Sequence, residues 1–352
     1  MTLYPNLILE ALSHVKYPGK EGNIVSLNMI ADNIRIDGLK VTFSLLLRPN
    51  DPFGKSLVKA CEQAILTYIG QDVDIKGNID IISIKPETTV EEKPLSSVKC
   101  KIAISSGKGG VGKSTVSANL AVALVKQGYK VGLLDADIFG PSIPKMFGIE
   151  SERPVADDEG KIVPIEKYGV KILSIGFFVD PKSAIVWRGA MASNAIKQLI
   201  TDAAWGDLDF FLIDLPPGTS DIHLTIVGSL QLDGAIVVST PQAVALADAI
   251  KGIDMFQNDK VNVPILGLIE NMAWFTPAEL PNNKYYLFGK DGVKQLAAEK
   301  GLTLLGQIPI VQRICESGDA GSPIALDDNE IVTQAFENVA KNSIFAKIST
   351  QL

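Results

Sequence analysis

The sequence predicts an α/β protein in which a parallel sheet has helices on both faces and a small α+β domain precedes it. From Lys101 onward, short apolar runs alternate with segments of helical pattern. Strands that are apolar throughout and are each followed by a helix are typical of a parallel sheet covered on both faces. The preceding residues have a different pattern, and a charged, proline-bearing stretch separates the two parts. The predicted organisation is therefore a small domain at 1–85, a linker at 86–98 and a larger domain at 99–352.

The first predicted domain opens with the helical segment NLILEALSHV, which ends at a Pro-Gly turn. The apolar alternation in IVSLNMI and DNIRIDG and the run VTFSLLL predict two or three strands, split by the turn residues Asp37 and Gly38. The spacing over 56–70 predicts a helix with Gly70 as its C-cap. The segment VDIKGNIDIISI can close the sheet, which completes a small α+β domain.

Residues 107–115 read GKGGVGKST, a P-loop with an additional lysine after its first glycine. The glycines let successive backbone N–H groups point at phosphate oxygens. Lys113 supplies a charge for the β- and γ-phosphates, and the Ser114 hydroxyl can ligate Mg²⁺. The strand-like run 101–105 and the helical segment after the loop place the phosphates at a helix N-terminus, which favours anions. The larger domain is thus predicted to be a P-loop NTPase domain that binds a nucleoside triphosphate through Gly107, Lys108, Gly109, Gly110, Val111, Gly112, Lys113, Ser114 and Thr115.

The composition of the chain argues against several classes of partner. The net charge is −7 over 352 residues and no basic cluster stands out, which disfavours nucleic acid and anionic membranes. No run of about eighteen apolar residues is present, and the N-terminus has no charged-then-apolar signal. The three cysteines are widely separated and include no CxxC pair, which is typical of the reducing cytoplasm.

Acidic residues end two predicted strands near the P-loop. Asp214 ends FFLID, where a carboxylate can hold Mg²⁺ together with Ser114. Asp135 and Asp137 lie at the end of VGLLDAD, where one can position the attacking water and the other can support Mg²⁺ or the loop. We favour Asp137 for the water, and ordinary aspartate turns are the alternative interpretation.

The segment LPPGTSD after this strand has the composition of a switch loop, whose order depends on the bound nucleotide. Asn271 ends a further strand, where its amide either reads the adenine edge or forms a turn. The two histidines, His14 and His223, are not expected to be catalytic. Arg188, in a Trp-Arg-Gly turn, either contacts a partner or packs. The predicted switch residues are Asp135, Asp137, Pro216, Pro217, Gly218, Thr219 and Asp221.

The sequence resembles a known family from about Lys99 to Asp327. GKGGVGKST matches the deviant Walker A motif of the MinD/ParA, nitrogenase iron protein and arsenite-pump ATPases. LDADIFGPSIP, DFFLIDLPPGTSDIHLT, STPQAVALADAIKGIDMF, GLIENM and LLGQIPI together resemble the Mrp/ApbC iron–sulfur cluster carrier ATPases. The first eighty-odd residues resemble a small domain found in iron–sulfur assembly factors.

This resemblance implies a homodimer that hydrolyses ATP slowly with Mg²⁺. Lys108 would reach the partner subunit's nucleotide, and Lys108, Lys113 and Asp137 would be the catalytic residues. Asn271 would belong to the ATP site, and Asp214 with Ser114 to the Mg²⁺ site. The resemblance also implies that iron–sulfur clusters are bound and passed to apoproteins or other assembly proteins.

The chain departs from the family pattern where the cluster ligands are expected. Relatives follow ENM with a CPxC motif, whose thiolates hold a cluster across the dimer. Here the equivalent positions are Thr276 and Glu279, or Pro277 and Leu280 in the other register. The Tyr-Pro-Gly at 17–19 also replaces an Asp-Pro-Glu that relatives often carry.

The cluster ligands are therefore unassigned from the sequence, and two alternative functions stay open. The pattern around Cys61 predicts a buried core residue. No second cysteine lies at a spacing from Cys100 or Cys315 that would indicate a cluster site. One alternative is a nucleotide-switched protein-binding ATPase that carries no cluster. The other, a partition or division-site ATPase, is disfavoured because the C-terminal segment has only two lysines and no arginine.

Overall fold

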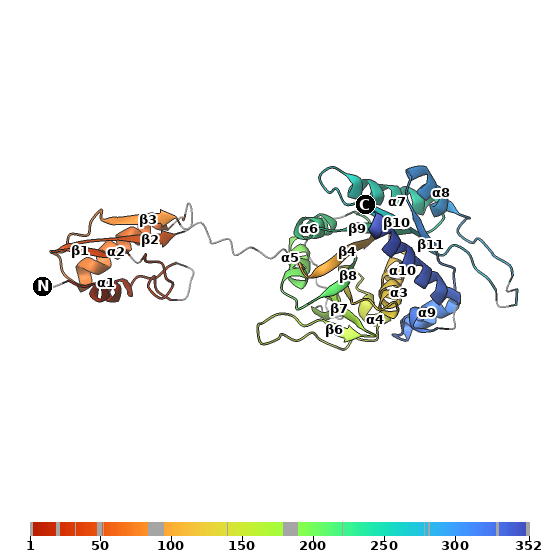
Figure 1. The fold of residues 1–352 in the computed structure, drawn as a ribbon, viewed down its shortest axis with the longest axis horizontal. Coiled ribbons are helices and arrows are strands. Elements are labelled where there is room, and N and C mark those ends of the chain that lie inside the picture. Colours follow the sequence, from red (N-terminus) through yellow and green to blue (C-terminus); the bar gives the residue numbers. More distant parts are fainter. Residues whose placement is uncertain are drawn as a thin grey trace. The chain divides into compact units, whose positions relative to one another are not determined.

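The computed structural model describes residues 3–18, 22–31, 33–47, 51, 53–83, 95–138, 140–178, 189–219, 221–277, 279–280, 282–328 and 331–349 (Figure 1). The chain divides into two compact units, Met1–Glu91 and Glu92–Leu352, and each is described by itself. Most of the predicted linker at 86–98 lies outside the described residues, as does Arg188.

The first unit is a three-stranded sheet in the order β1-β2-β3 with two helices. Strands β1 and β2 are antiparallel and meet at the predicted turn, while β3 is parallel to β2. Residues of both helices and of the central strand form one core, which includes Leu12, Phe43, Cys61 and Ile65. The elements are α1 (Pro5–Leu12), β1 (Arg35–Asp37), β2 (Lys40–Leu47), α2 (Gly54–Tyr68) and β3 (Ile79–Ser83).

Two local predictions for this unit were wrong. IVSLNMI is not a strand but a series of turns, because the Asn23 side-chain oxygen accepts the N–H groups of Val25 at 3.0 Å and Ser26 at 2.9 Å. Such local hydrogen bonds compete with a strand ladder. Helix α2 ends earlier than expected, so its C-cap is Ile69 rather than Gly70.

The second unit is an eight-stranded sheet in the order β11-β10-β9-β4-β8-β5-β7-β6 (Figure 1). All neighbouring pairs are parallel except β6 with β7 at one edge. Its strands are β4 (Val98–Ser105), β5 (Val131–Asp135), β6 (Ile165–Lys167), β7 (Val170–Ser174), β8 (Leu208–Asp214), β9 (Gly234–Ser239), β10 (Ile265–Glu270) and β11 (Leu304–Gln307). Its helices are α3 (Lys113–Lys126), α4 (Ile143–Met146), η1 (Ile175–Phe178), α5 (Gly189–Thr201), α6 (Asp221–Ser229), α7 (Ala243–Gln257), α8 (Gly292–Lys300), α9 (Gln312–Asp319), η2 (Ile324–Leu326) and α10 (Ile331–Ser349).

Helices cover both faces of this sheet, as the sequence predicts. On one face α3 and α10 pack on the apolar strands. On the other face α5 and α6 form one core with the strands, and α7 and α8 form another (Figure 1). Strand β4 lies between β8 and β9, so the P-loop leaves the sheet at its centre. Among the described residues, no helix combines the length and apolar character that crossing a membrane requires.

Candidate nucleotide-binding site

The P-loop connects the end of β4 to the first turn of α3. Gly110 and Gly112 have φ values of +82° and +80°, which favour glycine because other side chains are strained there. A Cβ atom at Gly107 would collide with the backbone of α7, and one at Gly112 would collide with the amide of Asn271. The loop therefore needs glycine both for its turns and for its packing against neighbouring elements.

A pocket of about 220 Å³ lies over the P-loop. Because it opens at the N-terminus of α3, its backbone N–H groups and helix dipole suit phosphate. Lys113 is buried beneath it and Lys108 is half-buried. The lining residues are Ser106, Lys108, Gly109, Gly110, Val111, Gly112, Lys113, Ser114, Thr115, Asp137, Ser142, Met146 and Pro217.

Asp214 lies fully buried at the end of β8 and contacts three side chains of α3. Its Oδ2 atom accepts a hydrogen bond from Ser114 Oγ at 2.6 Å and ion-pairs with Lys113 Nζ at 2.8 Å. Its Oδ1 atom accepts from Ser117 Oγ at 2.6 Å. The structure thus brings together Ser114 and Asp214, the two predicted Mg²⁺ ligands, whose hard oxygen donors fit that ion.

The two acidic residues after β5 have different environments. Asp135 is fully buried beside Asp214 in the sheet, and burial, with the charge of Asp214, raises its pKa to about 8. It accepts hydrogen bonds from Ser174 Oγ at 3.0 Å and from the backbone N–H of Asp137 at 3.1 Å, so it holds this loop in place. Asp137 lines the phosphate pocket. This placement supports assigning the water to Asp137, although that role stays a prediction.

The predicted switch loop lies beside the P-loop. Pro217 lines the phosphate pocket, and the N–H of Gly218 donates to the carbonyl of Ser106 at 2.9 Å. Pro216 is buried and Thr219 is exposed, while Asp221 begins α6. The two loops are therefore joined through their backbones. Whether the order of the loop follows the nucleotide stays a prediction.

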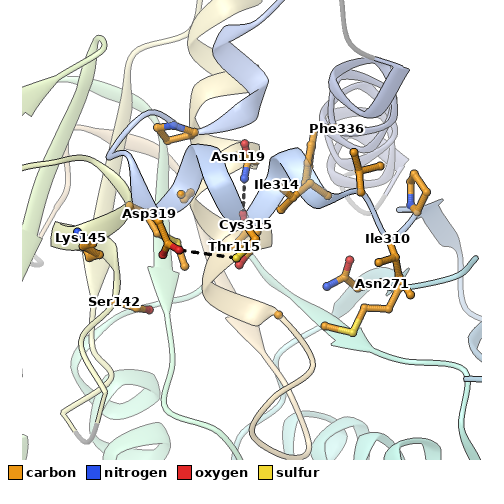
Figure 2. A pocket seen from close by; sticks show the side chains of 18 of the residues that line it. Thr115, Asn119, Ser142, Lys145, Asn271, Ile310, Ile314, Cys315, Asp319 and Phe336 are labelled. Carbon is orange, nitrogen blue, oxygen red and sulfur yellow. Dashed lines mark hydrogen bonds between the residues drawn. The ribbon is translucent and has the colours of Figure 1, made fainter. Parts of the chain in front are cut away.

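A second, largely apolar pocket of about 460 Å³ is drawn in Figure 2. It is continuous with the first pocket, with which it shares Gly112, Thr115, Ser142 and Met146. Asn271 lies on its wall, and its Nδ2 donates to the carbonyl of Val111 at 2.8 Å. The remaining wall comes from distant parts of the chain, including Ile310, Ile314 and Phe336. Asn271 was indicated because residues that follow the carboxyl ends of parallel strands meet at one edge of the sheet. The same argument could have indicated Ile310, which lies shortly after β11. Phe336 lies within α10, and nothing in the sequence around it indicates a binding site.

Residues 97–344 match the model of the family described as "NUBPL iron-transfer P-loop NTPase". Residues 6–76 match the family described as "Iron-sulfur cluster assembly protein". The first match spans well over half of the chain. This chain belongs to the iron-transfer P-loop NTPase family.

Relatives of this family member carry related names. An "Iron-sulfur cluster carrier protein" of Aquifex aeolicus is 51% identical over 253 residues, which are 71% of this chain and 68% of the relative. One of Synechocystis is 39% identical and covers 99% of this chain and 98% of its own length. A solved structure of a nucleotide-binding protein with ADP from Archaeoglobus fulgidus is 37% identical, with a TM-score of 0.60, covering 69% of this chain and 95% of its own.

The three cysteines of this family member belong to three different elements, α2, β4 and α9. Cys61 is buried in the first unit and Cys100 in β4, where burial raises the pKa of each thiol to about 12. Cys315 is exposed on α9 and lines the apolar pocket. In the described part of the chain no three His, Cys, Asp or Glu side chains are grouped to hold a metal ion.

The segment in which the family resemblance leads us to expect a CPxC motif forms an aromatic hairpin. After β10, Phe275 pairs with Tyr285 in an antiparallel bridge and with Ile310 in a parallel one. Lys284 lies over the Trp274 ring, with Nζ 3.7 Å from the centroid. Several apolar side chains of this hairpin are exposed, namely Leu280, Tyr285, Tyr286, Leu287 and Phe288.

The two histidines lie outside the site. His14 stacks on Tyr68 in the first unit, with ring centroids 4.0 Å apart. His223 is buried in α6.

Proposed function

We propose that this chain binds and hydrolyses MgATP as a homodimer and passes iron–sulfur clusters to apoproteins. The observation that carries the nucleotide part is the continuity of the two pockets, which share Gly112, Thr115, Ser142 and Met146. A polar pocket over the P-loop suits a triphosphate, and the apolar pocket beside Asn271 suits an adenine base. Their junction lies where the ribose would connect the two.

The residues around the phosphate pocket have different roles in the proposed hydrolysis. Lys113 turns from Asp214 to the β- and γ-phosphates, and Asp137 orients the attacking water. Ser114 and Asp214 would hold Mg²⁺, which supplies charge neutralisation on the phosphates. Lys108 acts in the partner's site, where a cation stabilises the negative charge that develops on the transferred phosphoryl group.

Two features support a dimer through the edge of the sheet that is formed by the carboxyl ends of its parallel strands, where the P-loop also lies. Lys108 lies at this edge, where it can face a second copy. The hairpin after β10 exposes apolar side chains at the same edge, with Leu287 62% exposed. Val244, at the start of α7, is 68% exposed. Burying such side chains between two copies would favour association.

The proposal of cluster delivery is supported by membership of the iron-transfer family and by the names of its relatives. Because this chain lacks the CPxC motif, other residues or a partner protein would supply the ligands. A second candidate function, a nucleotide-switched protein-binding ATPase without a cluster, is favoured by one observation. Cys61 and Cys100 are buried thiols of raised pKa, whereas clusters are held by thiolates. The cytoplasmic location stays a prediction.

Nucleotide binding, hydrolysis and molar mass test the ATPase part. Titration with ADP and ATP, phosphate release, and light scattering with and without MgATP should show binding, Mg²⁺-dependent turnover and a mass near twice that of the monomer. A protein that binds neither nucleotide would refute this part.

Anaerobic reconstitution with iron and sulfide separates the two candidates. The carrier function predicts bound iron and sulfide with visible absorbance, and transfer to an apo-ferredoxin. A colourless, iron-free protein that still hydrolyses ATP would instead support the protein-binding ATPase.

A further inference from the structure

The two oxygens of the Asp214 carboxylate serve different partners. Oδ2 contacts Lys113 Nζ at 2.8 Å and Ser114 Oγ at 2.6 Å. These two residues are the ones whose side chains turn to the nucleotide in the proposed function. Oδ1 instead accepts a hydrogen bond from Ser117 Oγ at 2.6 Å. Ser117 does not line either pocket around the P-loop.

Ser117 lies one helical turn beyond Lys113 on α3 and is fully buried, as is Asp214. Its hydroxyl has a single hydrogen and two acceptors within reach, the Lys113 carbonyl at 3.1 Å and Asp214 Oδ1 at 2.6 Å. The shorter bond to an ionised acceptor is the stronger one. A buried serine in a helix usually bonds only to the carbonyl four residues before it, as Ser343 does with Val339 at 2.7 Å.

The Asp214 carboxylate is therefore held at Oδ1 by Ser117, while Oδ2 can exchange its present partners for others. In the proposed function, nucleotide would draw Lys113 and Ser114 away from their present contacts with Oδ2. The bond from Ser117 to Oδ1 needs no such change, because neither atom faces the pockets. Asp214 thus keeps its orientation while its second oxygen becomes available to a cation.

We infer that Ser117 is a positioning residue for the Mg²⁺ site: its hydroxyl anchors Asp214 Oδ1 to α3, so that Oδ2 is the oxygen presented to the metal. The inference rests on the proposed binding of MgATP and extends it by one residue. Groups that orient a metal ligand typically contribute about 10- to 100-fold to metal affinity.

The test compares the Mg²⁺ dependence of nucleotide binding in Ser117→Ala and wild-type full-length protein. Fluorescent N-methylanthraniloyl-ADP is titrated in EDTA and then at increasing Mg²⁺. In Ser117→Ala, we expect the Mg²⁺ concentration for half-maximal enhancement of binding to rise about tenfold. Affinity in EDTA should stay at the wild-type value, because the P-loop backbone and Lys113 are intact.

Ser343→Ala is the matched control, since it removes a buried helical hydroxyl away from the site and should leave both titrations unchanged. Equal loss of affinity in EDTA and in Mg²⁺, or an unchanged Mg²⁺ requirement, would overturn the inference. If circular dichroism shows that Ser117→Ala does not fold, Ser117→Cys, with its weaker donor, is judged by the same criterion. A wild-type protein that binds no nucleotide would refute the proposed function instead.

Discussion

At the scale of residues, the buried charges around the phosphate pocket are not balanced. Asp135 and Asp214 are neighbours in the sheet, and Lys113 is the buried cation that contacts Asp214. Two carboxylates beside one ammonium leave an excess of negative charge when both are ionised. Burial first, and then the charge of Asp214, raise the pKa of Asp135 to about 8, while Lys113 acts in the opposite direction. A divalent cation beside Asp214 would offset the excess, which is a second reason why these residues fit Mg²⁺.

The Lys108→Ala variant should lose hydrolysis and keep nucleotide binding. The P-loop backbone and Lys113 remain in place, while the cation offered to the partner's site is removed. Loss of such a cation in trans typically lowers the rate by about 10³-fold or more. Phosphate release and ADP titration measure the two properties. Wild-type turnover in this variant would exclude the cross-subunit role.

Cys315 should report on nucleotide through its chemical reactivity. It is the exposed cysteine and it lines the apolar pocket, whereas Cys61 and Cys100 are buried with pKa values raised to about 12. In the folded protein we therefore expect iodoacetamide to modify Cys315 alone, as mapped by mass spectrometry. Saturating nucleotide should slow this modification at least about tenfold. An unchanged rate would place the base elsewhere, and reaction of all three thiols in urea provides the control.

At the scale of elements, the hairpin after β10 stands where the family resemblance leads us to expect a CPxC motif. Its bridge from Phe275 to Ile310 continues the parallel pairing of β10 and β11 beyond the carboxyl ends of these strands, and its bridge from Phe275 to Tyr285 closes the hairpin. Phe288 at its end lines the apolar pocket. An aromatic hairpin thus occupies the position expected for that motif, and it connects the apolar pocket to the surface proposed for dimerisation.

Leu287→Asp should weaken the MgATP-dependent dimer without unfolding the monomer. The side chain is 62% exposed, so the monomer loses little packing, about 0.5 kcal/mol or less. In a dimer the new carboxylate would be buried without a partner. Sedimentation velocity with MgATP measures the dimer, and melting temperature checks the fold.

Val155→Asp is the matched control for the hairpin variant. Val155 is 66% exposed. Its loop hydrogen-bonds to residues 202–204, which precede β8 and therefore lie at the amino ends of the parallel strands, away from the proposed interface. This substitution should leave the dimer intact. Equal dimerisation of Leu287→Asp and wild type would remove the hairpin from the interface.

At the scale of the whole molecule, the chain forms two units with separate cores. Every residue that lines the phosphate pocket and the apolar pocket, where we propose that nucleotide binds, lies between Ser106 and Phe336 and hence in the second unit. A fragment of residues 95–352 should therefore fold and bind ADP with the affinity of the full chain. Calorimetric titration tests this, and a fragment that melts cooperatively yet binds no ADP would contradict it.

Much of the second unit could be predicted from local sequence. Nearly all-apolar strands followed by helices indicate a parallel sheet, and the P-loop indicates its own place between strand and helix. Asp214 and Asn271 were indicated because each ends a strand, and the structure has both beside the P-loop, in contact with Ser114 and with the carbonyl of Val111. In the first unit the alternation in IVSLNMI wrongly predicted a strand. The Asn23 side chain accepts hydrogen bonds from nearby backbone N–H groups and so stabilises turns, and the spacing of apolar residues does not reveal such bonds.

By itself, then, the sequence determined the fold class, the P-loop and the likeness to iron–sulfur carriers, since these depend on contiguous residues. Only the tertiary structure decided which oxygen of Asp214 meets Ser114 and which meets Ser117, and that Asp135 is buried while Asp137 lines the pocket. It also decided that Phe336 joins Asn271 around one cavity. These outcomes depend on the strand order and on how α3 and α10 dock on the sheet, which bring together side chains far apart in the chain.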